Sequence, residues 1–126
     1  MTESETPYAL TIERRDGYLY ARVTALQIDA EAFATLLGDL ADECRRCDCD
    51  KILLYRKVPS MPGVASTFEI VTRMLQLLPG LMVAIVNPYR SNSELLTFAA
   101  ETAQSRGYDM RVFNDERAAK KWLGIA

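Results

Sequence analysis

The spacing of hydrophobic residues changes repeatedly along this 126-residue chain, and this change limits the possible folds more than any other feature. Between residues 8 and 23 apolar and polar side chains alternate, which is typical of β-strands. Asp16-Gly17 divides this stretch, and Asp-Gly supplies the positive φ values that a tight hairpin turn requires. The chain is therefore expected to open with an antiparallel β-hairpin.

From residue 29 the spacing is that of a helix followed by a short strand. Asp29 is a natural N-cap, and Glu31 suits the positive end of a helix dipole. The apolar side chains that follow recur every three or four residues, as in an amphipathic helix, at Phe33, Leu36, Leu37, Leu40 and Cys44. An apolar run of strand length comes next, at Ile52–Tyr55.

A second helix and a third apolar strand are predicted in the middle of the sequence. The helix carries a stripe of apolar residues over positions 64–78, and its start is ambiguous between Pro62 and a capping box at Ser66–Glu69. Pro79-Gly80 ends it. Leu81–Val86 is continuously apolar, as expected for an internal strand that is covered on both faces.

Two further helices and a last strand complete the pattern. A capping box at Ser91–Glu94 opens a helix that ends at Gly107 and places on one side Leu95, Phe98, Ala99 and Thr102. Asp109–Phe113 is the last strand. Asp115 then caps a terminal helix with the expected inward residues Ala118, Ala119, Trp122 and Leu123.

This order, β-β-α-β-α-β-α-β-α, defines an α/β fold. Strands that alternate with helices are mostly parallel and joined by right-handed crossovers, so we predict a five-stranded mixed, mostly parallel sheet with four helices. The length is that of one domain, and the sequence contains no repeat, linker or low-complexity tract. Residues 1–126 are expected to form a single domain, with the polar and acidic residues 1–7 as a flexible tail.

Composition excludes several classes of function. A net charge of −2, with basic residues scattered along the chain, argues against nucleic-acid binding. The longest aliphatic run is too short to span a bilayer. The chain contains no His and no Gly-rich phosphate loop, so the usual general base and nucleotide cradle are both missing. We therefore expect neither an enzyme nor a bound cofactor.

Three cysteines form the one cluster with chemical character, at Cys44, Cys47 and Cys49. Their thiolates could hold zinc or copper(I), with a fourth ligand from Asp48 or another subunit, and a redox role is also open. Structural zinc sites use paired knuckles far apart in sequence, and no second knuckle exists here. We expect no metal: Cys44 packs in the helix stripe and the other two lie reduced near its end. An odd number of cysteines is not a disulfide framework, which favours a reducing cytoplasm.

The order of elements and the chain's ending resemble those of the SpoIIAA-like branch of the STAS fold. The ending is Val112-Phe113-Asn114-Asp115-Glu116, followed by Ala118-Ala119 and Trp122-Leu123. Bacterial anti-sigma-factor antagonists and a group with Sec14-like topology share this fold. The topological resemblance covers nearly the whole chain, whereas the motif covers about fifteen residues. It implies a regulatory protein that acts through protein–protein contact.

In the antagonist family a phosphorylatable serine stands where the strand after the first helix runs into the second helix. The matching region here is Arg56–Glu69, and it lacks the Asp-Ser signature. Ser66, at the predicted helix N-terminus, is the best-placed candidate for a phosphate, which would meet free N–H groups there. The alternative interpretation is that Ser66 is only a helix cap.

The carboxyl ends of parallel strands are where open α/β sheets bind ligands. Three segments are expected to meet there: Arg56-Lys57, Asn87–Arg90 and Asn114. Together with two helix N-termini they would favour an anion, with Arg56 and Arg90 as its basic residues. The competing interpretation is that these loop side chains are solvated.

The second helix carries a flanking apolar row beside its core stripe, and the preceding loop extends it. The resulting candidate interaction surface consists of Met61, Pro62, Val64, Ile70, Met74 and Leu77. In the antagonist family this helix and loop form much of the partner-binding surface, so the resemblance implies contact with a protein partner or a second copy of the chain. The alternative function is a binding domain for an apolar or amphipathic ligand with an anionic head.

Overall fold

The computed structural model describes residues 8–25, 30–58, 80–89, 93–107 and 109–125, together with Glu69, Thr72 and Gln76. The described strands are β1 (Ala9–Arg15), β2 (Tyr18–Thr24), β3 (Lys51–Lys57), β4 (Met82–Val86) and β5 (Asp109–Phe113). The described helices are α1 (Ala30–Cys47), α3 (Ser93–Ser105) and α4 (Glu116–Leu123). Of the predicted second helix, only three positions are described, and all three are helical.

The five strands form one mixed sheet in the order β1-β2-β3-β4-β5. β1 and β2 are antiparallel, and β2 to β5 run parallel to one another. The register pairs Arg15 with Tyr18, so the hairpin turn is the two residues Asp16-Gly17, with Gly17 at a φ of 85°. Both the hairpin and the mostly parallel sheet predicted from the sequence are confirmed.

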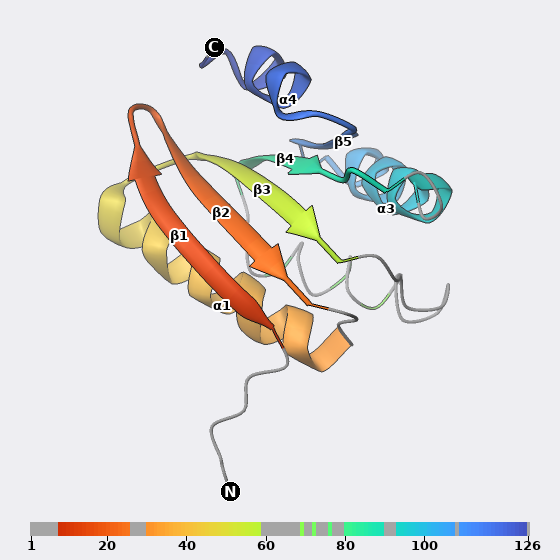
Figure 1. The fold of residues 1–126 in the computed structure, drawn as a ribbon, viewed down its shortest axis with the longest axis horizontal. Coiled ribbons are helices and arrows are strands. Elements are labelled where there is room, and N and C mark those ends of the chain that lie inside the picture. The colour runs from red at the N-terminus through yellow and green to blue at the C-terminus, as the bar shows by residue number, and fades with distance from the viewer. Residues whose placement is uncertain are drawn as a thin grey trace, which may run out of the picture.

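Helices cover both faces of the sheet, and each face has its own apolar core. Figure 1 shows α1 running behind β1, β2 and β3. In the same view α4 lies at the top, beyond β4 and next to the C-terminus. The larger core joins the sheet to α1 and α3, and includes Leu19, Ile52, Val83, Leu40 and Ala103. The smaller core joins the sheet to α4, and includes Tyr20, Leu53, Val86, Ala119 and Leu123. Alternate residues of β2, β3, β4 and β5 thus serve opposite cores, as the pleat requires, whereas β1 contributes to the larger core alone.

The terminal helix follows its sequence prediction closely. The Asp115 side chain accepts a hydrogen bond of 2.8 Å from the backbone N–H of Ala118 and so caps α4. Ala119 and Leu123 are buried, while Ala118 and Trp122 are half-buried. The Trp122 ring lies 5.8 Å from that of Phe113 at the end of β5, centroid to centroid, which anchors the helix to the last strand.

The packed side of α3 overlaps the predicted one at Ala99 but is rotated away from Phe98. Phe98 is 44% exposed, and the buried residues of this helix are Ala99, Ala100 and Ala103. A helix with alanines on its inner side can approach the sheet closely, and here α3 packs against β5. The inner side is formed by small residues, Ala99, Ala100 and Ala103, which share the larger core with Met110 of β5. Leu95, which shared the predicted side with Phe98, has no described side chain.

Candidate functional site

Three polar side chains follow the apolar rows of the sheet at its carboxyl edge. The register pairs Tyr55 with Val86 and Val86 with Phe113, so the next position on each strand brings together Arg56, Asn87 and Asn114. We call these three residues the polar row. By alternation they lie on the α1/α3 face, beyond the buried residues Leu54 and Ile85. The sequence prediction that these segments meet is therefore supported by the register.

Hydrogen bonds fix the polar row. The Asn87 N–H donates to the carbonyl of Phe113 at 2.8 Å, which extends the β4–β5 pairing by one residue. The side-chain Nδ2 of Asn87 donates to the carbonyl of Tyr89 at 2.8 Å and closes the turn after β4. Nδ2 of Asn114 donates to the carbonyl of Asn87 at 3.3 Å. Asn87 is completely buried, so its side chain is part of the fold and is not displayed to solvent.

Arg56 is the one buried charged side chain among the described residues, with 3% exposure. Its Nη1 donates to the carbonyl of Val58 at 2.7 Å and so holds the residue that leads into the segment after β3. Burial disfavours the charged form and lowers the pKa of Arg56 to about 10, while Tyr89 opposes this shift. The guanidinium remains protonated at neutral pH, so a positive charge is held at the carboxyl edge.

The other predicted site residues fall into two groups. Lys57 is described and exposed, and it alternates onto the opposite face from Arg56. Ser66 and Arg90, the other candidate anion-site residues, lie outside the described residues. So does the whole candidate interaction surface of Met61, Pro62, Val64, Ile70, Met74 and Leu77. Both sites therefore remain predictions, and Arg56 is the one described member of the candidate anion site.

The cysteines lie at the opposite edge of the sheet, where α1 ends and β3 has not yet begun. The N–H of Cys49 donates to the carbonyl of Cys44 at 3.1 Å, and Asp48 between them has a φ of 56°. This is the geometry of a Schellman cap, in which a left-handed residue turns the chain back over the last helical turn. The cap brings Cys44, Cys47 and Cys49 to the same helix end. Cys44 is buried in the larger core, as predicted, and the other two are half-buried.

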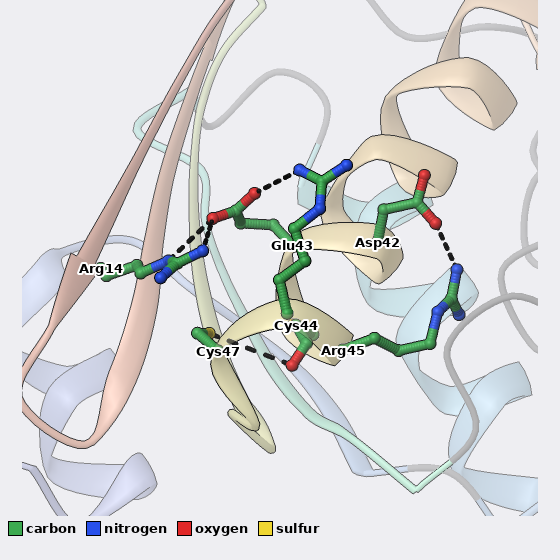
Figure 2. Close-up of polar contacts among 7 residues, drawn as sticks. Arg14, Asp42, Glu43, Cys44, Arg45 and Cys47 are labelled. Atoms are coloured by element: carbon green, nitrogen blue, oxygen red, sulfur yellow. Dashed lines mark hydrogen bonds and ion pairs between the residues drawn. The ribbon is translucent and has the colours of Figure 1, made fainter.

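A cluster of ion pairs lies beside this cap, and Figure 2 shows Glu43 at its centre. Arg14 of β1 donates through Nε to Glu43 at 2.8 Å, and Arg46 donates to the other carboxylate oxygen at 3.2 Å. The hydrogen bond from Arg14 is the main reason that the pKa of Glu43 is lowered from its usual value. Arg45 pairs with Asp42 one turn earlier. The edge strand β1 is thus tied to the end of α1.

The sulfur atoms of Cys47 and Cys49 lie 2.8 Å apart. Their contact raises the pKa of Cys49 to about 11, with burial as the second cause. Burial also raises the pKa of Cys44 to about 12, so this thiol stays protonated at neutral pH. No group of three metal-ligating side chains with suitable geometry occurs in the described part of the chain. Sequence reasoning missed the sulfur contact. The residue in the sequence that indicates this contact is the intervening Asp48, because Asp tolerates the left-handed conformation better than most residues.

Two clefts are lined by described residues. One of about 570 Å³ lies between β1 and α1 and is lined by Tyr8, Ala9, Leu10, Ile12, Asp39, Asp42, Glu43 and Arg46. The other, of about 330 Å³, lies between α3, β5 and α4 and is lined by Gln104, Gly107, Asp109, Met110, Arg111 and Trp122. Neither cleft is lined by the polar row, so neither corresponds to the predicted anion site.

The arrangement of strands and helices matches solved structures over nearly the full chain. An anti-sigma factor antagonist from Mycobacterium paratuberculosis aligns with a TM-score of 0.61 at 15% identity, covering 98% of this chain and 99% of that one. A DUF3478-family protein with a SpoIIAA-like fold from Shewanella loihica PV-4 aligns at 0.58 and 20% identity, covering 98% of both. The anti-sigma factor antagonist SpoIIAA in its unphosphorylated form aligns at 0.58 and 16% identity, covering 94% and 99%.

These alignments define the class of protein by its architecture: the chain has the SpoIIAA-like, or STAS, fold. The resemblance inferred from the chain's ending is thereby confirmed at the level of fold. No family model and no curated protein sequence matches the chain. No helix in the described residues is long and apolar enough to cross a membrane.

Proposed function

We propose that this chain is a non-enzymatic regulatory module that acts by binding another protein or a second copy of itself. The observation that carries the proposal is the near-complete structural alignment with two anti-sigma factor antagonists, proteins named for a regulatory activity. The identities of 15% and 16% leave open the pathway in which this chain acts.

The polar row supports placing the contact at the carboxyl edge of the sheet. Arg56 anchors Val58, and Val58 is the last described residue before the predicted loop and helix that carry the candidate interaction surface. If the segment that follows Val58 starts from a fixed position, its apolar residues are presented in a more defined arrangement. This lowers the entropic cost of binding. The charge of Arg56 would favour a partner with an acidic group beside an apolar patch.

A charge substitution on the candidate interaction surface tests the proposal. Met74→Asp is expected to keep the fold and to abolish self-association, because it places a carboxylate among apolar side chains that a partner would desolvate. Gln76→Asp is the matched control, since Gln76 is an exposed helical position within the predicted second helix and receives the same charge. Native mass spectrometry of both variants and the parent protein, compared with their denatured masses, provides the measurement.

A homodimer in the parent and in Gln76→Asp, but a monomer in Met74→Asp, would support the proposal. A monomer of the parent that carries a few hundred extra daltons would instead favour the binding of a small amphipathic ligand. If Met74→Asp unfolds while Gln76→Asp does not, Met74 belongs to the core and the interaction surface is wrong. Circular dichroism of each variant distinguishes this last case.

A further inference from the structure

We propose that Cys47 and Cys49 are a redox modification site: a dithiol that a peroxide oxidises to an intramolecular disulfide. The proposal does not rest on the proposed function. The two thiols lie at the amino edge of the sheet, just before β3 begins at Lys51, whereas the polar row lies at the carboxyl ends of the strands. Each proposal can therefore fail without the other.

The geometry of the helix end brings the two sulfur atoms together. Two residues separated by one position point apart in a helix or lie far apart along a strand, so a close i,i+2 contact requires a sharp turn between them. Asp48 supplies it with a φ of 56°, and the hydrogen bond from Cys49 to Cys44 holds the turn closed. The resulting sulfur separation is 2.8 Å, compared with about 2.05 Å in a disulfide. A movement of about 0.8 Å, well within side-chain motion, would form the bond.

The surroundings separate this pair from the third cysteine. Cys47 and Cys49 are half-buried, so a molecule as small as hydrogen peroxide can reach them. The guanidinium of Arg14, which is held by Glu43, lies close enough to both cysteines to interact with them electrostatically. Cys44 is 4% exposed within the larger core, so a peroxide does not reach it and it does not take part. The pair is therefore distinguished from Cys44 by access as well as by distance.

The oxidation balances with a peroxide as the oxidant. The Cys47 thiolate attacks one peroxide oxygen, the O–O bond breaks, and the released hydroxide takes up a proton to become water. Cys47 is then a sulfenic acid. The Cys49 sulfur attacks the Cys47 sulfur, the S–O bond breaks, and a second water leaves with the Cys49 proton. Two thiols are oxidised and one peroxide is reduced to two waters. A thiol reductant reverses the reaction by disulfide exchange.

Peptide mapping tests this proposal directly. Trypsin cuts after Arg46 and after Lys51, so Cys47 and Cys49 fall in one short peptide, 47–51, and Cys44 falls in another. Native protein is treated with hydrogen peroxide, alkylated in urea and digested. We expect peptide 47–51 to escape alkylation with a mass about 2 Da below its dithiol form. The peptide that contains Cys44 should be fully alkylated. Dithiothreitol before alkylation should restore both thiols.

Variants identify the roles of the two thiols. Cys44→Ser is the matched control and should still form the disulfide. Cys49→Ser should stop at a sulfenic acid on Cys47, which dimedone traps. Alkylation of both thiols of peptide 47–51 after peroxide, a covalent dimer through either thiol, or loss of the reaction in Cys44→Ser would overturn the proposal.

The turn at Asp48 can be tested separately from the thiols. Asp48→Val disfavours positive φ and is expected to slow disulfide formation on the order of tenfold, whereas Asp48→Gly allows it and should keep the parent rate. Melting curves confirm that both variants are folded. Equal rates in the two variants would show that the cap does not pair the sulfurs and would overturn the proposed basis of the site.

Discussion

Arg56 and Cys44 show how burial changes the chemistry of single side chains in this protein. The guanidinium of Arg56 loses hydration, and its hydrogen bond to the Val58 carbonyl offsets part of that loss. Sequence reasoning identified Arg56 as a basic residue at the carboxyl edge but could not predict that it is buried, because loop arginines are usually solvated. Cys44 was predicted correctly, since its place in the helix stripe specifies its burial.

Cys44 makes stability depend on pH in the alkaline range. Burial raises its pKa from 9.0 to about 12 in the folded protein. As pH rises above about 9, the unfolded chain loses this proton while the folded chain keeps it, so unfolding becomes more favourable. The stabilising contribution is fully present below pH 9 and is lost progressively as pH approaches 12.

Substituting Cys44 should remove this dependence. Urea titrations of the parent protein and Cys44→Ala are compared between about pH 8 and pH 10.5. The free energy of unfolding of the parent should fall more steeply with pH, so the gap between the two proteins should narrow by roughly 1.4 kcal/mol per pH unit well above pH 9. Other groups titrate in both proteins and cancel in the difference. A difference in the free energy of unfolding that stays constant over this pH range would contradict the raised pKa of Cys44.

At the scale of elements, strands and caps were predictable and helix rotation was not. The hairpin was specified by Asp16-Gly17, and the start of α4 by Asp115, because each depends on local backbone chemistry. The rotation of α3 depends instead on the space left beside the sheet. Its sequence allows two adjacent sides that share Ala99, one reaching Phe98 and the other reaching Ala100 and Ala103, and only packing against β5 selects between them.

A pair of substitutions in α3 tests which side faces the core. Phe98→Ser is expected to change the free energy of unfolding by no more than about 0.5 kcal/mol, since Phe98 is 44% exposed and lies off the packed side. Ala103→Leu should cost about 1–3 kcal/mol, because Ala103 is completely buried and extra methyl groups would overpack the contact with β5. Urea titration measures both. The reverse order of losses would show that the predicted side, with Phe98 inward, is the packed one.

At the scale of the whole molecule, the sheet separates two apolar cores that must fold together. β3 and β4 contribute alternate residues to both: Ile52 and Val83 to the larger core, Leu53 and Ala84 to the smaller. A strand cannot adopt its conformation for one face alone, so the loss of either core destabilises the other. This coupling was implicit in the predicted element order, because continuously apolar parallel strands are buried on both faces.

Matched alanine-to-glycine substitutions in the helices on the two faces test whether the two cores unfold together. Ala41 in α1 and Ala119 in α4 are both buried, one against each core. Ala41→Gly and Ala119→Gly should each lower the free energy of unfolding by about 1 kcal/mol, because glycine gains more backbone freedom on unfolding. The double variant should lose about 2 kcal/mol, since the two sites lie on opposite faces without shared partners.

The shape of the urea transition carries the stronger part of this test. All four proteins should show a single transition with the same slope against urea concentration, and circular dichroism and Trp122 fluorescence should report the same midpoint. Trp122 packs against Phe113 on the α4 side, so its fluorescence follows the smaller core, whereas circular dichroism follows every helix. If Ala119→Gly shifted the fluorescence midpoint alone, α4 and its core would unfold separately. The sheet would then join two units of different stability rather than one cooperative domain.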